Sequence, residues 1–197
     1  MNSHAAALPQ QKRAADRASR SGIWIGVFTI TMSFAAFTSA LFVREGTADW
    51  GHLVLPSVLY LNTLVLLLSS ATFELSRRSL AAGSLIAPEG ARKTSRWLLL
   101  TLLLGLGFCA GQFVAWHKLR AQGIYLATNP NSSFFYVLTF AHALHVLAGI
   151  AALVYLVARL MAGHATFRRS FFENTAIYWH FMGFLWVYLY LLYRIKL

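Results

Sequence analysis

Five long apolar segments, separated by shorter polar stretches, make up most of the 197-residue chain. A helix needs about 20 consecutive apolar residues to cross the hydrocarbon core of a membrane. Lipid offers the backbone no hydrogen-bond partners, so each segment is expected to be helical. None of the segments contains a lysine or arginine, and we predict spanning helices at Ile23–Val43, Leu53–Phe73, Trp97–Trp116, Phe134–Ala158 and Ala176–Tyr193.

This pattern predicts an all-α, polytopic membrane protein with two parts. Residues 1–22 form a polar N-terminal tail, and residues 23–197 form a single five-helix transmembrane domain. The first apolar run is longer than the core of about 7–15 residues that a secretory signal has, so we expect it to be retained as a span. The Arg- and Ala-rich start leaves a mitochondrial presequence as an alternative.

Composition supports the membrane assignment, and the placement of the basic residues argues against a nucleic-acid partner. The chain is 58% hydrophobic and 12% charged, whereas an ordinary soluble domain carries about 25% charged residues. The net charge of +11 would suggest nucleic acid only if the basic residues formed a folded patch. They lie between the apolar segments instead, and we expect no nucleic-acid partner.

The same basic residues predict the orientation of the chain. Twelve of the 17 Lys and Arg residues fall in the N-terminal tail and in the connections after the second and fourth spans. Basic residues are retained on the cytoplasmic side. The N-terminus is therefore predicted to be cytoplasmic and the C-terminus to lie outside.

The polar residues of the second span share one helix face. Asn62 and Ser69 are seven residues apart, which places them one above the other. Such residues in a span usually form hydrogen bonds to a neighbouring helix. Glu74 closes the span beside Arg77 and Arg78, and we favour a local ion pair there over a proton relay.

Small residues recur every four positions in the third span, at Gly107, Gly111 and Ala115. A stripe of this kind lets another helix backbone approach closely, and Gly149 of the fourth span is expected to serve helix packing too. Gln112 lies beside the stripe and needs a hydrogen-bond partner. The only cysteine, Cys109, lies in the same span, which excludes a disulfide framework within the chain.

The fourth and fifth spans carry histidines. His142, His145 and Gly149 share one face of the fourth span, and Glu173 stands seven residues before His180. These groups could converge to bind a metal or haem, relay protons, or bond to other helices. Two histidines on one helix at this spacing cannot supply both axial ligands of a haem. Neutral imidazole has one donor and one acceptor, so we favour bonds to helices or lipid head groups.

No catalytic or metal-binding residue is therefore predicted in this chain. Any chemistry is expected in the spans or in partner subunits, because the connections are too short for a soluble substrate domain. Ser132 or Ser133 is expected to cap the fourth span. The predicted polar residues that contact other helices or lipid are Asn62, Ser69, Glu74, Gln112, His142, His145, Glu173, Trp179 and His180.

Four phrases occur in order, one in each span from the second to the fifth. They are "LNTLVLLLSS", "GQFVAWHKL", "SSFFYVLTFAHALHVLAG" and "YWHFMGFLWVYLYLLY". Together they resemble the cytochrome c oxidase subunit III family of haem–copper oxidases, over about residues 22–194. The characteristic positions of that family correspond here to Thr139, His142, Leu144, His145, Val146, Gly149, Tyr178, Trp179, His180 and Phe181.

The resemblance implies a subunit without redox centres, held beside the catalytic subunit I and the copper subunit II. Haem and copper would lie in those partners, and the complex would reduce oxygen and pump protons. This subunit would stabilise the catalytic subunit, bind phospholipid and support proton uptake. Longer family members have seven spans, so five spans indicate a short bacterial form in the inner membrane. Gly183 stands where relatives often have an aspartate.

The sequence is compatible with several alternatives. Within the family, cytochrome c is favoured as electron donor over quinol, and an association with nitric oxide reductase or with a larger supercomplex is a related possibility. An independent membrane cytochrome would bind haem through its own histidines. A transporter should show broken spans or inverted repeats, and the sequence shows neither.

Overall fold

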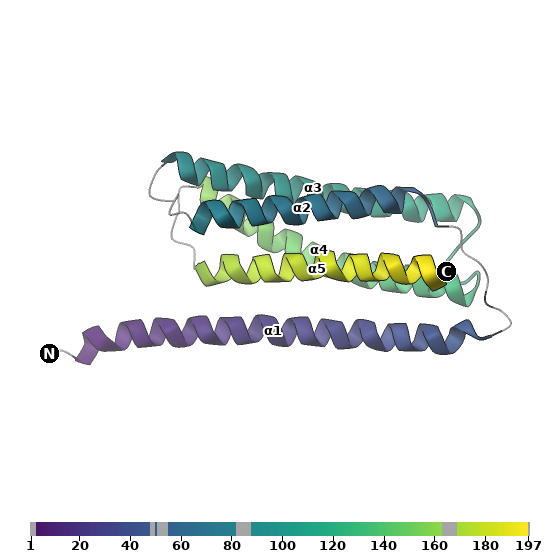
Figure 1. The fold of residues 1–197 in the computed structure, drawn as a ribbon, viewed down its shortest axis with the longest axis horizontal. Coiled ribbons are helices and arrows are strands. Elements are labelled where there is room, and N and C mark those ends of the chain that lie inside the picture. Colours follow the sequence, from purple (N-terminus) through teal and green to yellow (C-terminus); the bar gives the residue numbers. More distant parts are fainter. Residues whose placement is uncertain (1–2, 48–49, 51–54, 82–87, 163–168, 197) are drawn as a thin grey trace.

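The computed structural model describes residues 3–47, 50, 55–81, 88–162 and 169–196, and these parts of the chain form helices and connections without a strand. Each helix is long and apolar enough to cross a membrane, which confirms the all-α, five-span prediction. The helices are α1 (Ser3–Glu45), α2 (Val58–Ala81), α3 (Pro88–Ala121), α4 (Pro130–Met161) and α5 (Arg169–Lys196) (Figure 1).

Most helices extend beyond the apolar segments that predicted them. α1 has 43 residues and begins at Ser3, so the polar tail continues the first span as helix. The tail is rich in Ala, Lys, Arg and Gln, which are good helix formers in water. α2 begins at Val58, just after Pro56, and the predicted start at Leu53 lies outside the described residues.

The helices form a four-helix ring with a fifth helix against one side. Contacts join α2 to α3, α3 to α4, α4 to α5 and α5 to α2, while α1 packs against α4 and α5. In Figure 1, α1 runs alongside the bundle, and the two termini lie at opposite ends of it. α5 touches α1, α2 and α4, so its side chains reach most of the interior.

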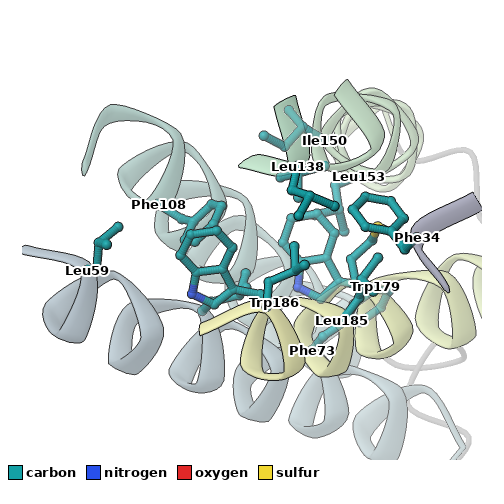
Figure 2. Packing of buried hydrophobic residues seen from close by; sticks show 14 of the residues in the cluster. Phe34, Leu59, Phe73, Phe108, Leu138, Ile150, Leu153, Trp179, Leu185 and Trp186 are labelled. Atoms are coloured by element: carbon teal, nitrogen blue, oxygen red, sulfur yellow. The ribbon is translucent and has the colours of Figure 1, made fainter. Parts of the chain in front are cut away.

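Aromatic side chains fill that interior. Trp179 and Trp186 of α5 point inward, toward Phe108 of α3 and Ile150 of α4 (Figure 2). In a membrane, helices gain little from burying apolar surface, because lipid is equally apolar; close packing and hydrogen bonds hold them together instead. The buried aromatic residues therefore supply much of the close packing inside this bundle.

The start of α4 is fixed by a capping box. The Oδ1 atom of Asn129 accepts a hydrogen bond from the Ser132 amide at 2.7 Å, and the Ser132 hydroxyl accepts one from the Asn129 amide at 3.2 Å. The cap is thus Asn129, where the sequence suggested Ser132 or Ser133. Asparagine is favoured there because Pro130 holds the preceding residue extended and opens the helix.

Candidate functional site

Hydroxyl groups link α2 to α3 along the predicted polar face of α2. The Ser69 hydroxyl donates to the Thr101 carbonyl at 3.1 Å, and the Thr72 and Thr101 hydroxyls share a hydrogen bond at 2.9 Å. Nearer the end of α2, the Ser76 hydroxyl donates to the Thr94 carbonyl at 3.1 Å. All these side chains are buried. Each such bond contributes about 0.6 kcal/mol in a membrane protein. The α2–α3 contact is therefore stabilised by several of these bonds together.

The small residues of α3 permit the close contact with α2 at one point. A Cβ atom on Gly111 would overlap the side chain of Asn62, whose amide donates to the Phe108 carbonyl at 3.3 Å. Gly107 has more room, because the nearest atom to a Cβ there would be 3.9 Å away. Ala115 is fully buried. Of these three small residues, Gly111 is therefore the one for which the approach of α2 requires glycine.

Trp179 is the residue that joins α5 to three other helices. Its indole Nε1 donates to the Ser69 hydroxyl of α2 at 3.1 Å, and its ring is 1% exposed. A Cβ on Gly105 of α3 would lie 2.7 Å from its Cη2 atom, and one on Gly149 of α4 would lie 3.0 Å from Cε3. The indole is thus enclosed between two glycines and held by a hydrogen bond.

Other aromatic side chains also donate hydrogen bonds across helix boundaries. The four bonds are Trp116 Nε1 to Thr139 Oγ1 at 3.1 Å, Trp186 Nε1 to Thr63 Oγ1 at 3.1 Å, Tyr188 OH to Thr38 Oγ1 at 3.0 Å, and Tyr178 OH to the His145 carbonyl at 2.9 Å. As a group, these donors were not recognised from the sequence. The signal was present, since a buried indole or phenol needs an acceptor.

His142 lies at the centre of the bundle and makes contacts through its ring faces and edges. It is fully buried, and neither ring nitrogen has a hydrogen-bond partner among the described residues. Its ring centroid is 5.2 Å from that of Trp186 and 5.9 Å from that of Phe108. The structure therefore shows aromatic packing where the sequence suggested a hydrogen bond. Gln112 is also buried, and its two amide atoms have no partner within the described ranges.

His145 points away from His142, toward α1. Its Nδ1 atom lies 2.7 Å from the Ala141 carbonyl of its own helix, and its ring meets Phe34 of α1 edge to face at 5.9 Å. The imidazole thus bonds within α4, whereas the sequence suggested a bond to another helix or to lipid. Its contact with a second helix is aromatic.

A charged cluster joins α2 to α5 near the other histidine. Glu74 accepts hydrogen bonds from Arg77 at 2.7 Å and from Arg78 at 3.0 Å. Arg77 also lies 3.6 Å from Glu173 of α5, and His180 Nε2 is 3.9 Å from Glu74. These side chains are partly exposed, and exposed ion pairs contribute at most about 1 kcal/mol each.

The three histidines consequently occupy three separate environments. His142 is in the core, His145 faces α1, and His180 lies by the charged cluster, so the convergence considered from the sequence does not occur. Within the part of the chain that the structure describes, no group of three or more His, Cys, Asp or Glu side chains is arranged to hold a metal ion.

Gly183 marks a close approach between α5 and α2. A Cβ atom there would lie 3.0 Å from the Ser70 hydroxyl oxygen. A larger side chain at this position would have to displace Ser70 or separate the helices. Gly183 therefore permits the close packing of α5 against α2.

Replacing His142 with phenylalanine is expected to leave the stability of the purified chain unchanged or to raise it by about 1 kcal/mol. The change removes two buried nitrogen atoms without partners in the described residues, which normally cost stability, and keeps the aromatic contacts. Thermal unfolding in detergent measures the effect. Thr139→Val is the control, and it should lower stability because Trp116 loses its acceptor. A large loss in His142→Phe would contradict the packing role.

Comparison with known proteins identifies a family for the chain. The family model of cytochrome c oxidase subunit III matches residues 22–195. The chain is 30% identical over 174 residues to a probable cytochrome c oxidase subunit 3 of Nocardia farcinica, covering 84% of this chain and 80% of that protein. It is 33% identical over 129 residues to the probable subunit 3 of Mycobacterium leprae, covering 65% and 61%.

Vertebrate proteins match over a smaller share of their length. The chain is 36% identical over 133 residues to cytochrome c oxidase subunit 3 of Coturnix japonica, which covers 66% of this chain and 47% of that protein. It thus spans about half the length of the vertebrate relatives and most of the Nocardia protein. The family match over nearly the whole chain and the relatives of similar length lead to one conclusion: the chain belongs to the cytochrome c oxidase subunit III family.

Proposed function

We propose that the chain is a subunit III without redox centres, bound to the catalytic subunit I and the copper subunit II of a terminal oxidase. Haem and copper reside in those partners, and this chain supports their stability and proton uptake. The observation that carries the proposal is the position of Trp179. Its indole N–H donates to the Ser69 hydroxyl, and its ring is enclosed by two glycines. The indole and Ser69 therefore serve the packing of helices within the membrane.

The relatives favour cytochrome c as the electron donor and a bacterial inner membrane as the location. Both mycobacterial and nocardial relatives are named for cytochrome c oxidase, and they match over more of their own length than the vertebrate proteins do. The donor and the membrane are proposals that follow from these names and lengths.

The outer surface fits a chain surrounded by lipid and protein in a membrane. Large apolar side chains are exposed on all five helices; examples are Phe28, Leu68, Phe113, Leu144 and Phe184. A partner subunit would cover part of this surface, and phospholipid would cover the rest. Bound phospholipid is therefore included in the proposed function.

The stabilising role is tested by comparing the complete oxidase with one from which this chain has been removed. The initial rate of cytochrome c oxidation and the haem content per catalytic subunit are expected to stay similar. The activity of the depleted enzyme should decay faster during turnover, and adding the chain back should restore the slower decay. Loss of haem in proportion to the chain removed would contradict the proposal.

A further inference from the structure

An apolar groove of about 530 Å³ lies between the end of α3 and the start of α4. Trp116 and Arg120 line it from α3, and Val137 and Phe140 line it from α4. Val137 and Phe140 are exposed, so the groove opens on the outer surface of the bundle. Tyr125 of the connection forms part of its wall.

The connection beside the groove is held in place by α4. Three side chains at the start of α4 donate to three successive carbonyl groups: Tyr136 OH to Ile124 at 2.9 Å, Ser132 Oγ to Tyr125 at 2.9 Å, and Ser133 Oγ to Leu126 at 2.5 Å. These bonds fix the wall of the groove before any ligand binds, which lowers the ordering cost of binding.

The groove has a polar end and an apolar end at the depths that a lipid requires. Trp116 is the last residue of the predicted apolar segment of α3, and tryptophan is typical of the membrane interface. Arg120 lies one turn beyond it, at head-group level. Val137 and Phe140 lie inside the apolar segment of α4, where the acyl chains would be.

The charges around the groove favour an anion. The sequence contains no Asp or Glu between residues 90 and 172, so neither α4 nor the membrane-crossing part of α3 offers Arg120 a carboxylate. Lys118 adds positive charge to the same end of α3. A guanidinium group matches the geometry of a phosphate. A cationic head-group moiety, such as choline, would find no acidic side chain on these segments.

We propose that this groove binds a glycerophospholipid with a net negative head group. The phosphate would pair with Arg120, and an acyl chain would lie along Val137 and Phe140. The inference rests on the lipid binding included in the proposed function, and it adds the location of the site and the class of head group.

The test uses the full-length chain, purified in detergent and freed of lipid. Phosphatidylglycerol and phosphatidylcholine with the same acyl chains are titrated separately, and bound lipid is counted by native mass spectrometry. Phosphatidylglycerol should bind more tightly. Arg120→Gln should weaken its binding about tenfold or more, since a charge-assisted hydrogen bond is lost. Lys118→Gln removes the same charge nearby without altering the groove lining, and it should have an effect of about twofold or less.

Two further arms distinguish a lipid site from a site for phosphate alone. Val137→Trp fills the apolar end and should weaken binding of phosphatidylglycerol while Arg120 is intact. Glycerophosphate, which lacks acyl chains, should not compete at the concentrations used. Effective competition would overturn the lipid proposal in favour of a simple phosphate site.

The site is also contradicted if Arg120→Gln and Lys118→Gln behave alike, or if phosphatidylcholine binds as well as phosphatidylglycerol. Unchanged thermal unfolding must accompany each comparison, and Val137→Trp decides the matter if Arg120→Gln does not fold. An oxidase that assembles normally while the groove binds no lipid refutes the site and leaves the proposed function standing. If the groove binds lipid but the chain does not assemble into an oxidase, the proposed function is refuted and the lipid site stands.

Discussion

Trp179→Ala is expected to destabilise the purified chain by about 3–5 kcal/mol, the range for truncating a large buried aromatic residue. The indole fills the space between Gly105 and Gly149, and its Nε1 atom is bonded to Ser69. Alanine would leave a cavity where α2, α3, α4 and α5 meet, and Ser69 would lose its donor. Denaturant-induced unfolding of the full chain in detergent measures the loss.

Two controls distinguish this role from a general sensitivity to tryptophan loss. Trp179→Phe removes the hydrogen bond and part of the volume, and it should cost about 1–2 kcal/mol. Trp24→Ala changes a tryptophan of α1 that is 56% exposed, and it should cost at most about 0.5 kcal/mol. Similar losses in Trp179→Ala and Trp24→Ala would show that the indole does not join the helices.

Gly105→Ala is the second change with a large expected effect, about 1–3 kcal/mol of destabilisation. The new Cβ atom would lie 2.7 Å from Cη2 of Trp179, which cannot retreat because Gly149 is close on α4. In an unhindered helix, the same substitution stabilises by up to about 1 kcal/mol. Gly107→Ala, on the same helix, provides that comparison because its nearest neighbour is 3.9 Å away.

A double-mutant cycle tests the cause of the Gly105 effect. Trp179→Phe removes the ring edge that contains Cη2, so Gly105→Ala should cost much less in that background. The two changes should therefore be non-additive by about 1 kcal/mol or more. Additive losses, or equal effects of Gly105→Ala and Gly107→Ala, would contradict the enclosed position of the indole.

The fold was predictable from sequence because lipid imposes a simple rule on the chain. Every apolar segment of sufficient length had to become a helix, and the five helices of the structure correspond to the five segments. The helix ends were not predictable from the same rule. α1 begins at Ser3, 20 residues before the first apolar segment, because helix propensity continues where lipid ends.

The polar residues of the site were recognisable, but their partners were not. Asn62 and Ser69 stood out because polar groups in a span need acceptors or donors. That Ser69 would meet Trp179 depends on how α5 packs against α2, about 110 residues away in sequence. Gly105 was overlooked because it does not belong to the four-residue stripe that drew attention to Gly107 and Gly111.

The neighbours of the histidines were also not predictable from the sequence. Their spacing on α4 predicted a shared face, yet His142 turns to Trp186 while His145 turns to Phe34 of α1. Residues at this spacing differ by about 60° around a helix, which is enough to face different neighbours when two helices pack on adjacent sides. Which neighbours they meet is set by tertiary packing.

In the proposed function, this chain contributes packing to an oxidase and carries no redox centre. The most direct test is to purify the oxidase by a tag on this chain, separate the chain in detergent, and record its visible spectrum and its iron and copper content. We expect a colourless chain without stoichiometric iron or copper, and haem bands in the remaining complex. A haem band or bound metal that stays with the chain and is lost in His142→Phe or His180→Phe would contradict this role.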